Sequence, residues 1–119
     1  MKRHYFIYLL LIISLIACDE IINEENLEND SLSVLAPLDN TQVATGEVFF
    51  DWEPVEGARS YTIQVAQPDF IQTAQLLLQQ TDSTTSASLN MTAGAYEWRI
   101  RAENDAYNSP YTTTSFTVQ

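Results

Sequence analysis

The chain is short and strongly acidic: 119 residues carry 16 Asp and Glu against 5 Lys and Arg, a formal net charge of −11. This length suits one small domain and leaves no room for a second hydrophobic core. The charge argues against a nucleic-acid-binding protein, because gripping phosphates needs clustered Lys and Arg. A single cysteine excludes an internal disulfide, and a hydrophobic content of 45% excludes a wholly disordered chain.

Residues 1–17 have the pattern of an export signal. Lys2 and Arg3 precede an almost unbroken apolar run from Tyr5 to Ala17. This run is shorter than the roughly 18–20 residues that a membrane-spanning helix needs, so a permanent transmembrane anchor is not expected.

The end of the apolar run, Leu-Ile-Ala-Cys at positions 15–18, resembles the lipobox of bacterial lipoproteins. The resemblance implies cleavage before Cys18, diacylglycerol on its thiol and acylation of the new amine, which together anchor a chain stably. The alternative is an ordinary secretory signal with an incidental cysteine. The position of the sole cysteine, directly behind the small Ala17, favours the lipoprotein.

An acidic segment follows the expected cleavage site. Residues 19–30 hold six acids and three Asn in twelve positions, which predicts a solvated tether over 18–30. Acids directly after a lipidated cysteine resemble the surface-export signal of Bacteroidetes lipoproteins, whereas Asp at that position resembles the inner-membrane retention signal of enterobacteria. We expect a lipid-anchored protein of the bacterial outer membrane, exposed at the cell surface.

From residue 31 onward, short alternating runs separated by turn residues predict β-strands. The seven runs cover 33–36, 47–52, 60–66, 75–80, 85–91, 95–102 and 111–118. The run at 75–80 also fits a short helix beginning near Phe70. Because each run is apolar on one face, the pattern predicts an all-β fold, an antiparallel sandwich of seven strands in two layers.

Two stretches of the expected sandwich resemble fibronectin type III domains, which have an immunoglobulin-like fold. Leu89 followed by GAYEWRIRAEN at 94–104 is similar to the sixth strand of that family, and Trp52 with the following residues to 65 is similar to the second and third strands. The resemblance implies a fibronectin type III-like domain over 31–119, with Trp52 as the central core aromatic. It also implies that the Tyr96 hydroxyl bonds the backbone just upstream.

The expected mature chain has no His, Lys or free thiol, so most pairs of a nucleophile and a base cannot be built. Paired acids such as Asp51 and Glu53 leave a glycosidase conceivable, but a small sandwich offers little volume for its cleft. We therefore predict no enzyme and no cofactor. Asn104, Asp105 and Asn108 could hold Ca²⁺, yet these residue types are equally the usual turn formers, and no metal site is expected.

Four aromatic residues are candidates for ligand contact: Tyr107 and Tyr111 around a polar loop, Phe49 on the outward face of its strand, and Phe70 after Pro68. Rings beside polar side chains are typical of sugar or peptide sites, although tyrosines can also simply pack over the ends of a sandwich. We expect a non-catalytic module that binds or adheres to a protein or glycan. The alternative is an accessory subunit of an outer-membrane complex, such as a glycan-uptake system.

Overall fold

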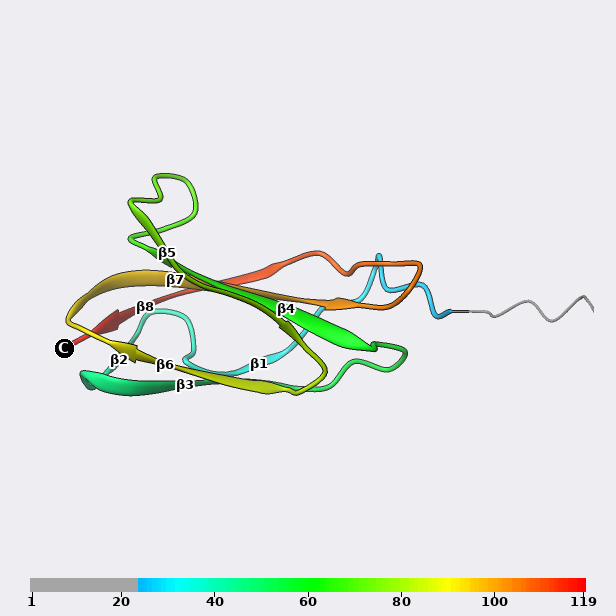
Figure 1. Ribbon diagram of the computed structural model, residues 1–119, viewed down its shortest axis with the longest axis horizontal. Coiled ribbons are helices and arrows are strands. Elements are labelled where there is room, and N and C mark those ends of the chain that lie inside the picture. The colour runs from blue at the N-terminus through cyan, green and yellow to red at the C-terminus, as the bar shows by residue number, and fades with distance from the viewer. Residues whose placement is uncertain (1–23) are drawn as a thin grey trace, which may run out of the picture.

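The computed structural model describes residues 24–119, which form two β-sheets packed face to face (Figure 1). One sheet has the order β1-β3-β6 and the other has the order β2-β8-β7-β4-β5. No helix occurs among residues 24–119, so the predicted all-β sandwich is confirmed. The strands are β1 (Val34–Ala36), β2 (Thr41–Val43), β3 (Gly46–Trp52), β4 (Ser60–Gln67), β5 (Gln75–Asp82), β6 (Ser86–Met91), β7 (Gly94–Glu103) and β8 (Thr112–Val118).

No helix in this described part of the chain is long and apolar enough to cross a membrane. The expected signal and the expected lipidation site, Cys18, lie outside the described residues.

The structure has one strand more than predicted, and one strand pair is parallel. The three-residue strand β2 is too short and polar to alternate visibly in the sequence, and it pairs with β8 in parallel, with Thr41 opposite Phe116. The connection from β1 carries the chain across to the other sheet, where Asn40 adopts a φ of 60°. The prediction of a purely antiparallel sandwich was wrong for this pair. The helix alternative for 75–80 was also wrong, because these residues belong to β5.

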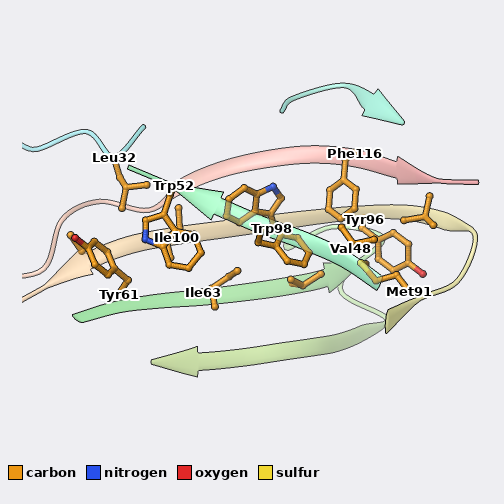
Figure 2. Close-up of a cluster of buried hydrophobic side chains, with 14 of the residues drawn as sticks. Leu32, Val48, Trp52, Tyr61, Ile63, Met91, Tyr96, Trp98, Ile100 and Phe116 are labelled. Atoms are coloured by element: carbon orange, nitrogen blue, oxygen red, sulfur yellow. The ribbon is translucent and has the colours of Figure 1, made fainter. Parts of the chain in front are cut away.

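A row of aromatic side chains fills the space between the sheets (Figure 2). Trp98 lies in the middle with no exposed surface, and its ring centroid is 5.2 Å from that of Phe50 in an edge-to-face contact. The Trp98 indole also donates a 3.1 Å hydrogen bond to the carbonyl of Pro37. Trp52, expected at the centre, is buried but lies toward one end of the row, beside Tyr61.

The hydrogen bond expected of Tyr96 is present. Its hydroxyl donates to the carbonyl of Thr92 at 2.8 Å, across the turn between β6 and β7. Tyr96 is buried and stacks on Phe116, with 5.8 Å between the ring centroids. This bond satisfies the one polar atom of a large ring that otherwise contributes apolar burial.

The segment 24–30 differs from the solvated tether that its acids predicted. Leu27 has no exposed surface and belongs to the core cluster, a burial that stabilises the fold by about 1.5–3 kcal/mol. A turn closed by the Asp30 N–H and the Leu27 carbonyl at 3.0 Å leads from it to β1. This segment therefore packs on the domain through Leu27 instead of extending into solvent.

Candidate ligand-binding face

Two of the three arginines among residues 24–119 contact aromatic rings on the outer face of the five-stranded sheet. The Arg99 guanidinium carbon is 4.2 Å from the ring centroid of Phe70 and 4.4 Å from that of Tyr111. The guanidinium carbon of Arg101 is 4.8 Å from the Tyr111 ring centroid. We call Phe70, Arg99, Arg101 and Tyr111 the aromatic–arginine cluster. Each such contact is worth roughly 0.5–1 kcal/mol at an exposed site.

The loop between β4 and β5 brings Phe70 to this cluster. The N–H of Ala74 bonds the carbonyl of Gln67 at 2.8 Å and so closes the loop. Inside the loop, the Asp69 carboxylate accepts the N–H groups of Ile71 and Gln72 at 3.0 and 2.6 Å, an arrangement typical of Asp in tight turns. The Phe70 N–H then donates to the Glu97 carboxylate on β7 at 2.9 Å. Asp69 shapes the loop, and Glu97 fixes it over the sheet.

Hydrogen bonds hold both arginines in place. Arg99 Nε donates to Gln64 on β4 at 2.7 Å, and Arg101 Nε donates to Glu103 at 2.7 Å. The same Glu103 oxygen accepts the Thr62 hydroxyl at 2.9 Å. Side chains that are already ordered lose little conformational entropy when a ligand binds, so this face is preorganised.

Beside the cluster, a groove of about 420 Å³ opens on the same face. Outward residues at the start of β7 and the end of β8 form its floor. The connection into β2 and the start of the β4–β5 loop form its walls. Most of its side chains carry hydroxyl, amide or carboxylate groups; the lining residues are Asn40, Thr41, Gln42, Pro68, Asp69, Ala95, Tyr96, Glu97, Ser115, Phe116 and Thr117.

Glu97 joins the groove to the cluster. One carboxylate oxygen accepts the Phe70 N–H, and the other accepts the Ser115 hydroxyl at 3.1 Å. Nearby in the groove lining, the Thr117 hydroxyl is buried and has no hydrogen-bond partner among residues 24–119.

The four aromatic candidates from the sequence do not share one site. Phe70 and Tyr111 meet at Arg99. Tyr107 is half-buried and packs against the core near the β7–β8 loop. Phe49 is 61% exposed, as its outward position predicted, but it lies on the other sheet, opposite Ser88 in register.

The sequence analysis missed Arg99, Arg101 and Glu97 as site residues. The alternation of 95–102 already placed all three on the outward face of one strand. That position was a usable signal, because side chains at i and i+2 of a strand lie on the same face.

The residues considered for Ca²⁺ have another role. The Asn104 amide oxygen accepts the N–H groups of Ala106 and Tyr107 at 3.0 and 2.8 Å, which is the behaviour of a turn residue. Over the range 24–119, no group of three or more His, Cys, Asp or Glu side chains is arranged to hold a metal ion.

The fold has relatives among solved structures, although neither a protein-family model nor a curated protein matches the sequence. A fibronectin(III)-like module of Clostridium thermocellum CbhA superposes with a TM-score of 0.55 at 13% identity, covering 75% of this chain and 96% of that one. The fold is that of a fibronectin type III domain. A human fibronectin type III domain, from the KIAA0970 protein, gives a TM-score of 0.56 at 15% identity over 80% of this chain and 76% of that one.

An engineered protein is also similar, with a TM-score of 0.59 and 18% identity over 75% of this chain. This chain spans only 20% of that protein's length. At these identities the likeness shows the fold alone, and the function must be argued from the site.

Proposed function

We propose that this chain is a non-catalytic binding module, anchored to the bacterial outer membrane through a lipid on Cys18, whose ligand is a glycan. The observation that carries the proposal is the groove of about 420 Å³ lying directly beside the aromatic–arginine cluster. Sugars present an apolar face to aromatic rings and hydroxyl groups to amides, hydroxyls and carboxylates. The groove and the cluster supply both kinds of contact on one surface.

Charge supports a neutral glycan. Around the cluster and groove, two arginines face the three carboxylates of Asp69, Glu97 and Glu103, and the chain as a whole has a net charge of −11. A strongly anionic polymer would be repelled on approach, and a neutral one would not.

The proposal of a non-catalytic role rests on the side chains available. Residues 24–119 contain no His, Lys or Cys, so most pairs of a nucleophile and a base cannot be built there. The fibronectin type III-like neighbours are generally non-catalytic modules.

Binding to a glycan array followed by calorimetry tests the ligand class. The mature chain (18–119) with Cys18→Ala serves as soluble protein, and Tyr111→Ala is compared with Phe49→Ala, a matched aromatic truncation on the opposite sheet. We expect Tyr111→Ala to weaken binding at least tenfold, which is about 1.4 kcal/mol, and Phe49→Ala to leave it unchanged. Equal losses in both variants would contradict the assignment of the site. Binding of a protein instead of a glycan would contradict the ligand class.

Protease treatment of intact cells tests the location. Digestion of the wild-type chain would support surface exposure. Protection until the outer membrane is opened would contradict it, and a wild-type Cys18 that carries no lipid by mass spectrometry would contradict the anchor.

A second candidate function is an accessory subunit of an outer-membrane complex. It is favoured by exposed apolar side chains on the three-stranded sheet, away from the groove: Phe49 is 61% exposed and Leu35 is 51% exposed. Such side chains are what a protein partner would cover. Loss of a co-purifying membrane partner in Phe49→Ser, with glycan binding intact, would support this role.

A further inference from the structure

The chain enters the domain through a docked segment, residues 24–32, which we call the strap. Glu24 forms an ion pair with Arg59, with 2.6 Å between Glu24 Oε1 and Arg59 Nη2. The Asn104 side-chain amide donates to the Glu25 carbonyl at 2.7 Å. Leu27 and Leu32 are buried in the core cluster. Charge, backbone and apolar contacts therefore hold the strap along its length.

Gly57 makes room for the strap. Its φ is +84°, and a Cβ built at this position would lie 2.5 Å from the Cβ of Glu25, closer than real side chains approach. The Gly57 carbonyl also accepts the Asn104 side-chain amide at 3.2 Å. A glycine is thus required here both by the turn and by the close approach of the strap.

The strap docks at one end of the sandwich. It lies between the β3–β4 turn (53–59) and the β7–β8 loop (104–111) (Figure 1). We call this end of the sandwich the entry pole. The turns at 44–45 and 92–93 lie at the opposite end, the far pole. The groove belongs to the far half of the molecule, because the start of β7 and the end of β8 form its floor.

Docking of the strap shortens the leash, by which we mean the stretch of chain between the expected anchor, Cys18, and the first residue that contacts the domain. From Cys18 to Glu24 the chain has six residue steps, which reach at most about 20 Å when extended. A tether free up to Asp30 would have twelve steps and reach about 40 Å, more than the roughly 33 Å length of β7. The long leash would let either pole face the membrane, whereas the short one keeps the entry pole near it.

We propose that the strap orients the domain, with the entry pole toward the lipid surface and the groove and far pole directed away from it. This inference rests on the proposed lipidation of Cys18. It places Tyr107 on the membrane side and the groove within reach of a ligand from outside. Acidic residues at the entry pole, including Glu53, Glu56 and Asp105, oppose close contact with an anionic bilayer, so the domain stands off the surface.

Fluorescence quenching in vesicles tests the orientation. The mature lipidated chain is reconstituted in phosphatidylcholine vesicles that carry a headgroup-attached quencher. A dye is placed on Ala106→Cys at the entry pole or on Ala93→Cys at the far pole; both alanines are exposed. Lipidation consumes the only native cysteine, so each label is unique. We expect at least threefold stronger quenching at position 106 than at position 93.

Two changes should abolish that difference by lengthening the leash. Leu27→Ser removes the buried contact of the strap, and its matched control Glu28→Ser changes an exposed neighbour. If Leu27→Ser failed to fold, insertion of twelve Gly and Ser residues between positions 23 and 24 would lengthen the leash while leaving the strap docked. We expect the ratio of the two quenching signals to fall toward one in Leu27→Ser and in the insertion variant, but not in Glu28→Ser.

Failure of the orientation and failure of the anchor give different results. Equal quenching of the two labels in a protein that floats with the vesicles would overturn the orientation alone. An unmodified Cys18 by mass spectrometry, with no flotation, would overturn the anchor and the orientation with it.

Discussion

The outer faces of the two sheets follow the same alternation of side chains but differ in how those side chains are used. On the five-stranded sheet, hydrogen bonds and cation–π contacts join loop and strand residues into the aromatic–arginine cluster. On the three-stranded sheet, Phe49 is 61% exposed and Leu35 is 51% exposed. Within the described part of the chain, the neighbouring Glu47 and Ser88 side chains make no hydrogen bond that would order that face.

The difference comes from the loops rather than the strands. Phe70 is carried by the β4–β5 loop, and Tyr111 directly precedes β8, whereas no loop among residues 24–119 folds over Phe49, which is 61% exposed. Strand periodicity predicts which side chains leave the core, but only the loops decide whether they are collected into a site. Three predictions test this contrast.

The largest effect is expected from Glu97→Ala, because this carboxylate fixes the loop to the sheet. Loss of its bonds to Phe70 and Ser115 should lower the free energy of unfolding by about 1–3 kcal/mol and weaken glycan binding. Urea unfolding of the Cys18→Ala chain measures the first effect. The control is Glu47→Ala, an exposed acid on the other outer face, for which we expect a change within about 0.5 kcal/mol. Equal effects of the two substitutions would show that the faces do not differ.

The strands of the sandwich were predictable because one local rule, the alternation of apolar and polar side chains along a strand, indicates them. The run at 95–102 alternates without a break, and the Tyr96 hydroxyl bond to Thr92 spans only four residues. The exposure of Phe49 followed from the same rule. Local patterns are reliable where the contacts that they create are local.

The features that the sequence did not predict depend on contacts between distant residues. Phe70, Arg99 and Tyr111 are brought together by the folded loop and by strand pairing, not by spacing. Leu27 is a single apolar residue among acids, which local composition assigns to solvent. Strand β2 is defined by its pairing with β8, which lies about seventy residues further along the chain.

An intermediate effect is expected from Arg99→Lys, which keeps the charge and removes the planar guanidinium. Arg99 contacts two rings and donates to Gln64, so we expect a loss of about 1–2 kcal/mol in stability. Arg59→Lys provides the control, since the Arg59 side chain is 58% exposed and pairs only with acids among residues 24–119. Thermal and urea unfolding of both variants measure the difference. A similar loss in Arg59→Lys would mean that the aromatic contacts of Arg99 add nothing.

The smallest effect is expected from Phe49→Ser. Phe49 faces Ser88 across the β3–β6 pair and belongs to no aromatic contact among residues 24–119, so its removal should change the free energy of unfolding by less than about 0.5 kcal/mol. Phe70→Ala, which loses the Arg99 contact, should cost more, about 1 kcal/mol, in the same urea titration.

Comparing Phe70→Ala with Phe49→Ser shows whether an aromatic ring on each outer face contributes to the stability of the fold. If Phe70→Ala costs stability and Phe49→Ser does not, the Phe70 ring contributes to the fold through Arg99. The exposed Phe49 ring is then explained by a partner and not by packing. If Phe49→Ser instead lowered stability by more than about 1 kcal/mol, cross-strand packing on the three-stranded sheet would account for Phe49. That result would also remove the main reason to assign a protein partner to that face.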